Sequence, residues 1–367
     1  MNIITGKITG IKYKVLLSED LQTVDIDKFN INKTPSYCLL NDKKYSYAIS
    51  KWVSPKRTRS YPYERVYNTL NVSKKITVIP VIKDEGFDGD RDFLQWDTVS
   101  LMSLLDVFVI FAYYDKAVKN QEYENKITDF KFNNEYVVSK IKEIEQYHSS
   151  ALHWNMNELT NNFHSIIDRA KSAYKKISNE TNVILHSQSG IDNFKEKIGK
   201  DTKTFMLFSR EKAEQAQARE SVTTQPKESL STFSKAKITI TNYLGGQYFF
   251  TVDEVLIDEN TVYLIEGKHS KQGVLPSMGD IKDGLLKMIL YSNLRDVEIN
   301  GKKIKSQSVL SLTSTKLAGG ITSETCTADR EKFITENKLK TDLQTLILEL
   351  FREANENNFT VKIGCTK

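Results

Sequence analysis

The feature that most constrains the fold is the order of hydrophobic patterns between Lys237 and Ser314. Three runs of strand-forming residues follow one another, KITITNYL, QYFFTVDEVLID and TVYLIEGKH, and turn residues at 258–260 separate the last two. The next segment, DIKDGLLKMILYSNL, repeats apolar residues at helical spacing, and SQSVLSLTS is a further strand-like run. This part of the chain therefore predicts elements in the order β–β–β–α–β, which is typical of an α/β fold.

Acidic and basic side chains stand on two of these strands. Asp253 lies early in the second run, and Glu266 and Lys268 close the third with Gly267 between them. Residues i and i+2 of a strand point to the same face, and a tight turn would bring Asp253 beside them. Glu254 is the second choice, because alternation places it on the opposite face. Two carboxylates can hold a hard divalent cation and a lysine can orient a water or stabilise developing charge, so the arrangement predicts phosphodiester hydrolysis.

This pattern resembles the PD-(D/E)-x-K nuclease superfamily. The dipeptide V-D at 252–253 and the tripeptide E-G-K at 266–268 are separated by twelve residues, with Val252 in place of the usual proline. Apolar strands flank both parts, and the following helix has the K-x-x-x-Y spacing of some members at Lys287 and Tyr291. The resemblance covers roughly residues 237–315.

The resemblance implies an α/β fold with a restriction-endonuclease-like αβββαβ core and a dependence on Mg²⁺, for which Mn²⁺ can substitute. It implies Asp253, Glu266 and Lys268 as the catalytic residues, and Asp253, Glu266 and Gly267 as the metal-binding residues. We also expect His269 and Lys271, which follow the motif in sequence, to contact DNA. A loop histidine without a function is the alternative reading of residue 269.

A free-standing chain of 367 residues without a helicase motif is most similar, within this superfamily, to a Type II restriction endonuclease. The expected activity is sequence-specific, Mg²⁺-dependent cleavage of double-stranded DNA in the cytoplasm, by a homodimer because two strands must be cut. A cognate DNA methyltransferase encoded nearby is the expected partner. One alternative is a DNA-binding or scaffold component of an anti-phage system with a degenerate nuclease core. Another is a nuclease that acts on RNA or on structured DNA.

Three regions are expected along the chain: an N-terminal α/β domain over 1–130, a helical segment with a connector over 131–235, and the catalytic core over 236–367. In the first, a helical pattern over Asp92–Leu105 joins two buried strand runs, Ile76–Ile82 and Asp106–Tyr114, which favours a parallel pairing. Apolar residues recur at three- and four-residue intervals over 134–180, which predicts one long helix or a helical hairpin. Residues 211–236 are polar and predict a helix that gives way to a connector near Pro226.

The segment 51–67 is the second candidate for contact with DNA, because its cations outnumber its acids and are interleaved with aromatic residues. The expected DNA-binding residues here are Lys56, Arg57, Arg59 and Arg65, and the aromatic residues are Trp52, Tyr61, Tyr63 and Tyr67. Arginine and lysine neutralise phosphates, and arginine also recognises guanine edges. The alternative is a basic turn that keeps the domain soluble.

Other features carry less chemistry. The acidic run 83–92 does not fit the Ca²⁺-loop spacing, so a structured turn is expected there. Cys38, Cys326 and Cys365 are widely separated and are expected to be reduced bystanders. No apolar run is long enough to span a membrane, and no secretory signal begins the chain. The net charge of +5 is compatible with an anionic partner without identifying one.

Overall fold

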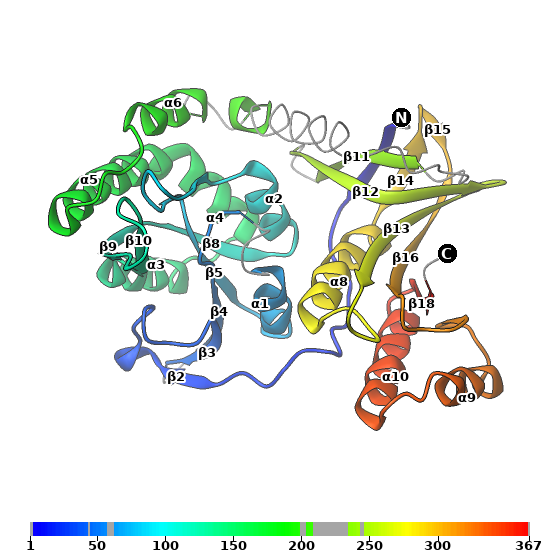
Figure 1. Cartoon of the computed structure of the whole chain (residues 1–367). Helices are drawn as coiled ribbons and strands as arrows, with labels where there is room; N and C mark the ends of the chain where they lie inside the picture. Colours follow the sequence, from blue (N-terminus) through cyan, green and yellow to red (C-terminus); the bar gives the residue numbers. More distant parts are fainter. Residues whose placement is uncertain are drawn as a thin grey trace. The chain divides into compact units, whose positions relative to one another are not determined.

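The computed structural model describes residues 3–42, 45–56, 62–198, 203–207, 234–242 and 246–365. The chain forms two compact units (Figure 1): unit 1 contains Met1–Glu19 and Pro226–Lys367, and unit 2 contains Asp20–Gln225. The expected boundaries at 130 and 235 are therefore wrong in two respects. The N-terminal residues belong with the C-terminal part of the chain, and the helical segment belongs with the N-terminal α/β part.

A mixed sheet organises unit 1. Within the described residues it has nine strands in the order β15-β14-β1-β11-β12-β13-β16-β18-β17. The N-terminal strand β1 lies inside this sheet, because it pairs in parallel with β11 and antiparallel with β14, and its residues Ile4 and Ile8 are buried. The strands are β1 (Ile3–Ile8), β11 (Ser234–Asn242), β12 (Gln247–Asp258), β13 (Thr261–Ser270), β14 (Arg295–Ile299), β15 (Lys302–Lys303), β16 (Lys305–Ser314), β17 (Gly320–Thr322) and β18 (Thr360–Cys365).

Three helices are present in the described part of unit 1. They are α8 (Met278–Ser292), α9 (Thr327–Glu336) and α10 (Thr341–Glu356). Helix α8 begins after Ser277, whose hydroxyl accepts a hydrogen bond from the backbone N–H of Asp280, as an N-cap residue does. It packs against β13 and β16, and α10 packs against β18 (Figure 1). The expected β–β–β–α–β order is present, with the β14–β15 hairpin inserted between α8 and β16.

The directions of the four central strands fix where the candidate site can lie. β12 is antiparallel to both β11 and β13, whereas β16 is parallel to β13. β13 alternates buried residues at 262, 264 and 266 on the face that α8 covers. The candidate residues at the end of β13 are therefore positioned between the sheet and this helix.

Unit 2 is built on a second sheet. Within the described residues its strand order is β2-β3-β4-β5-β8, and the short pairs β6–β7 and β9–β10 accompany it. The strands are β2 (Thr23–Asp25), β3 (Tyr37–Asn41), β4 (Ser46–Lys51), β5 (Lys75–Pro80), β6 (Ile82–Asp84), β7 (Arg91–Phe93), β8 (Val107–Ala112), β9 (Tyr114–Lys119) and β10 (Ile127–Phe132). The helices are the short 3₁₀ turn η1 (Ile26–Lys28), α1 (Pro62–Thr69), α2 (Trp96–Leu104), α3 (Asn134–Glu145), α4 (Ala151–Asn157), the π-helix η3 (Glu158–Asn162), α5 (Phe163–Thr181) and α6 (Ser189–Ile198).

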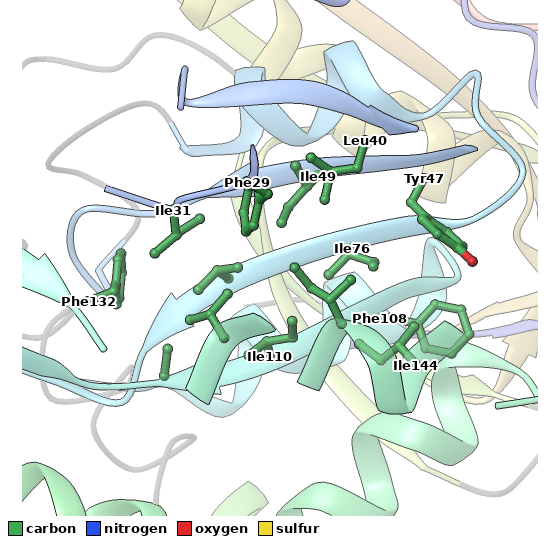
Figure 2. Packing of buried hydrophobic residues seen from close by; sticks show 14 of the residues in the cluster. Phe29, Ile31, Leu40, Tyr47, Ile49, Ile76, Phe108, Ile110, Phe132 and Ile144 are labelled. Carbon is green, nitrogen blue, oxygen red and sulfur yellow. The ribbon is translucent and has the colours of Figure 1, made fainter. Parts of the chain in front are cut away.

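The apolar runs of unit 2 form its core. β5 and β8 pair in parallel with α2 between them in sequence, which confirms the predicted strand–helix–strand unit. Figure 2 shows Ile76 and Ile110 of these strands packed with Phe108, and Ile144 of α3 lies in the same cluster. Helices α3, α4 and α5 contact β8 of this sheet, so they belong to the same unit as the N-terminal strands.

The edge strand β8 is covered by α4. The side-chain amide of Asn155 accepts a hydrogen bond from Val109 N at 2.7 Å and donates one to Val107 O at 2.9 Å. The indole of Trp154 donates to Val109 O at 2.9 Å. The polar edge that a terminal strand presents is thus satisfied by a helix, which leaves it unavailable for pairing with another chain.

The predicted helical pattern over 134–180 forms two stretches. α3 ends at Glu145, and α4, η3 and α5 then continue through residues 151–181. The break occurs where Ser150 acts as a new N-cap, its side chain accepting from His153 N. Most of the expected helix and connector over 211–236 lies outside the described residues.

Candidate active site

The ladder between β12 and β13 ends where the candidate residues begin. Its last paired residues are Glu254 and Ile265, so the neighbouring Asp253 and Glu266 stand just beyond the ladder. In place of a backbone partner from β12, the N–H of Gly267 donates to Oδ2 of Asp253 at 3.1 Å. The two strands separate at this point, and the carboxylate of one strand binds the backbone of the other.

A β-bulge in β12 accompanies this separation. β11 has one residue between Ser234 and Ala236, whereas β12 has two between their partners, Val255 and Val252. Val252 and Val255 are both buried although they are three residues apart, which an unbroken alternation would not allow. The extra residue lies at Asp253–Glu254, and bulges commonly redirect side chains in this way. Glu254 is exposed to solvent.

Glu266 occupies a core position of β13. It follows Val262 and Leu264 on the face under α8, and only 2% of its surface is exposed. Its Oε1 accepts a hydrogen bond from Nζ of Lys268 at 3.0 Å. A carboxylate at a position that would otherwise hold an apolar side chain costs free energy to bury, so its cationic neighbours are needed to offset that cost.

Lys268 links the strand to the helix. Its Nζ also donates to Oδ2 of Asp283 in α8 at 2.6 Å, so two carboxylates hold one ammonium group. Gly284 allows α8 to lie close to β16, because a Cβ at this position would lie 2.6 Å from Cδ1 of Leu310, while its distance of 3.5 Å from Cε of Lys268 would be an ordinary contact. Asp283 is not among the residues predicted from the sequence. Its spacing of four residues before Lys287 on one helix face is the signal that could have found it.

Lys287 is a second cation beside Glu266. It is buried, its ammonium group lies 4.6 Å from the ring centroid of Phe250 in β12, and its charge favours the ionised form of Glu266. The candidate site therefore combines the acids Asp253, Glu266 and Asp283 with two lysines.

The pKa values of Glu266 and Lys268 depend on burial and on the charges of their neighbours. Burial raises the pKa of Glu266 above its ordinary value, and the attraction of Lys287 and Lys268 opposes this shift without cancelling it. The negative charge of Asp253 adds to the increase. Burial lowers the pKa of Lys268, but Glu266 and Asp283 outweigh it and hold the pKa above its ordinary value. Lys268 is therefore a cation at neutral pH.

The donors present fit a hard divalent cation. The negative charge of Asp253 disfavours the ionised form of Glu266, and a bound cation would relieve that repulsion. Among the described residues no group of three or more His, Cys, Asp or Glu side chains is arranged to hold a metal ion. Mg²⁺ typically takes one or two carboxylates and completes its shell with water and phosphate oxygens, so two carboxylates suffice.

The other residues expected near the motif lie at its exposed end. His269 is exposed, and its Nδ1 lies 3.1 Å from Oγ1 of Thr313 on β16. Lys271 is exposed in the loop before α8, where its backbone carbonyl accepts a hydrogen bond from Thr315. His269 lies near the end of β13 and Lys271 follows the strand, so both side chains are accessible to a ligand that approaches this end of it.

The basic segment 51–67 lies in unit 2, and its described aromatic residues do not form a surface. Trp52, Tyr63 and Tyr67 are buried, and Trp52 packs edge-on against Tyr63 at 5.4 Å between ring centroids. The expected interleaving of cations with accessible rings is therefore wrong for these three positions, because the rings form part of the core. Tyr61 lies outside the described residues.

The four cations of this segment that are expected to bind DNA differ in their surroundings. Lys56 forms an ion pair with Asp92 at 2.6 Å, and Arg65 donates to the backbone carbonyl of Lys51 at 3.1 Å. Burial lowers the pKa of Arg65. Arg57 and Arg59 lie outside the described residues. The described part of the segment thus uses its cations to hold unit 2 together.

The acidic run 83–92 forms a structured turn. Asp84 accepts from Gly86 N at 3.0 Å and lies 2.8 Å from Nδ1 of His186, while Asp92 accepts from the hydroxyl of Ser54 at 2.9 Å. Internal partners therefore engage the two buried acids of the run. Cys38 is buried, Cys326 and Cys365 are exposed, and all three are free thiols.

No helix in the described ranges combines the length and the apolar composition that a membrane crossing requires. Comparisons of the chain with protein-family models, with curated proteins and with solved structures yield no match.

Proposed function

We propose that this chain is a Mg²⁺-dependent endodeoxyribonuclease of the Type II restriction class, with Asp253, Glu266 and Lys268 as its catalytic residues. The single observation that carries the proposal is the separation of β12 and β13 at these residues. The carboxylate of Asp253 reaches the N–H of Gly267, next to the buried Glu266 and its bonded Lys268. The central strands β11, β12, β13 and β16 support it, since their directions agree with the αβββαβ core that the motif implies.

Asp253 and Glu266 would bind the cation, with Gly267 contributing backbone. A bound Mg²⁺ polarises a phosphate and lowers the pKa of a water molecule. The ammonium group of Lys268 stays protonated and can stabilise the negative charge that develops on the phosphate oxygens. Because Asp283 and Glu266 both accept from it, this group is fixed before substrate binds, which removes the need to orient it during the reaction.

Asp283 acts through Lys268 and is therefore proposed as a positioning residue. His269 and Lys271, which are exposed, would contact the phosphates beside the cut bond. A homodimer would supply the second active site that cleavage of both strands requires. A DNA methyltransferase encoded nearby would protect the host sequence.

The test is cleavage by the full-length protein of a mixture of viral and plasmid duplex DNAs. Discrete fragments should form with Mg²⁺ or Mn²⁺, and none with Ca²⁺ or with a chelator, because Ca²⁺ fills oxygen sites with looser geometry. Parallel reactions with single-stranded RNA and branched DNA test the other substrates. Cleavage that survives exhaustive chelation would exclude this mechanism, and cleavage of RNA alone would exclude the DNA assignment.

A further inference from the structure

A cavity whose charged lining residues are mainly basic lies at the C-terminal end of α8. Its volume is about 690 Å³, and every residue that lines it belongs to unit 1. It lies between the segment 9–14 that follows β1, the end of α8 at Ser292 and Asn293, and the end of α10 at Glu356. This volume falls within the range of small-molecule sites.

Two asparagine side chains hold the wall of this cavity in place. The amide of Asn293 accepts from Lys12 N at 2.8 Å and donates to Lys12 O at 3.1 Å. The amide of Asn357 does the same for Lys14, at 2.7 and 2.9 Å. Because both backbone groups of these two alternate residues are fixed, the positions from which the two lysine side chains extend are defined.

The buried Glu353 of α10 fixes the same segment from below. Its Oε1 accepts from the hydroxyl of Tyr13 at 2.8 Å, and its Oε2 accepts from Leu16 N and Leu17 N at 3.0 and 3.1 Å. Three hydrogen-bond donors of the segment 13–17 thus satisfy its carboxylate. A glutamate of 0% exposure that is bonded in this way is a built feature rather than a surface coincidence.

The charge around the cavity is unbalanced. Lys12, Lys14 and Arg295 line it, against Glu356 as its one acidic lining residue. Lys14 pairs with Glu356 at 3.3 Å. In the described part of the chain, neither Lys12 nor Arg295 has an acidic side chain within ion-pair distance, and both are exposed. Two cations without a protein partner are therefore available to one ligand.

The C-terminal ends of α8 and α10 lie at this cavity, and carbonyl groups at these ends accept hydrogen bonds from asparagine residues. These carbonyl groups are therefore not free to offset the positive charge of Lys12 and Arg295. Asn293 donates to the carbonyls of Ile289 and Leu290 through its side chain and backbone, and Asn357 donates to Glu353 O and Ala354 O. The negative ends of α8 and α10 are capped by the residues that also hold the lysines.

We propose that this cavity binds a phosphate group through Lys12 and Arg295, as a site distinct from the cluster around Glu266. An anion with several oxygens can accept from an ammonium and a guanidinium group at once, which matches the cations present. The phosphate can come from a polynucleotide backbone or from a free nucleotide. The proposal does not depend on cleavage, so it is tested without a divalent cation.

The experiment measures binding in chelator by wild type and by the double variant Lys12→Glu, Arg295→Glu. The probes are a dye-labelled duplex oligonucleotide, followed by fluorescence anisotropy at several salt concentrations, and ATP, followed by calorimetry. The control is Lys332→Glu, Lys340→Glu, two exposed lysines of unit 1 outside the cavity, with the same change of net charge. Should the glutamate variant fail to fold, Lys12→Gln, Arg295→Gln replaces it.

If the phosphate belongs to a polynucleotide, the cavity variant should bind the duplex about tenfold more weakly than the control, with a salt slope smaller by about two. If it belongs to a nucleotide, wild type and control should bind ATP and the cavity variant should not. Equal behaviour of the cavity variant and the control toward both probes would overturn the proposal. Because no cleavage is measured, a failure of the proposed nuclease activity would leave this result unaffected.

Discussion

Glu266 is the residue at which the core of unit 1 and the candidate site overlap. It continues the buried positions of β13, and its charge is tolerated because Lys268 and Lys287 lie beside it. The grouping of Asp253, Glu266 and Lys268 could be predicted, since strand alternation and one tight turn are local rules. The contact of Lys268 with Asp283 could not, because it joins a strand to a helix and depends on how the two pack.

The raised pKa of Glu266 has a consequence for stability without metal. The folded protein holds a proton at this carboxyl more tightly than the unfolded chain does, so folding loses stability as the pH rises above the ordinary value of 4.5. Glu266→Gln removes this dependence. In chelator, the Tm of wild type minus that of Glu266→Gln should fall between mildly acidic and neutral buffer, as measured by calorimetry. A difference that grows in favour of wild type with rising pH would contradict the assigned shift.

At the scale of elements, the packing of α8 against β13 and β16 positions Asp283 and Lys287 beside the strand residues of the candidate site. Most of this could be predicted: the pattern of 280–294 indicates the helix, which spans Met278–Ser292. The bulge at Asp253–Glu254 could not, because it depends on the register with β11, whose residues pair across the sheet. β17, α9 and β18 lacked a strong enough pattern to be expected.

Gly284 tests the close approach of α8 to the sheet. Gly284→Ala places a methyl group 2.6 Å from Cδ1 of the buried Leu310. Overpacking of this kind costs about 1–3 kcal/mol, against a gain of about 1 kcal/mol in helix propensity. We expect a net loss in the free energy of unfolding, measured by urea denaturation, and partial recovery when Leu310→Val is added. The two changes should couple, and strictly additive effects would show that the helix has room at this position.

At the scale of the whole molecule, the two units are not consecutive in sequence. The chain begins in unit 1, forms unit 2, and then returns to unit 1. Local patterns predicted an N-terminal α/β part and a second sheet in the C-terminal part of the chain. They could not predict that β1 joins the second, because Ile3 pairs with Lys237 and the intervening residues form another unit. The alternation of apolar and polar residues in a short segment predicts a strand, but it does not predict which distant strand pairs with it.

This arrangement predicts which part of the chain depends on the N-terminal strand. Ile4→Asp places a charge at a fully buried position between β11 and β14. In hydrogen exchange followed by mass spectrometry, protection should fall in β11 and β14 and be retained in β5 and β8. Ile76→Asp in the core of unit 2 is the matched control and should give the opposite pattern. Loss of protection in β5 and β8 on Ile4→Asp would contradict the division into these units.

The most direct test of the central claim is the rate of DNA cleavage in Mg²⁺ by a set of isosteric variants. Asp253→Asn, Glu266→Gln and Lys268→Met should each lose activity by orders of magnitude, since such residues act as a unit. Asp283→Asn should be impaired less, because it acts through Lys268. Glu254→Gln, one residue along the strand and exposed, should cut like wild type. Undiminished cleavage by Asp253→Asn or Glu266→Gln would contradict the account.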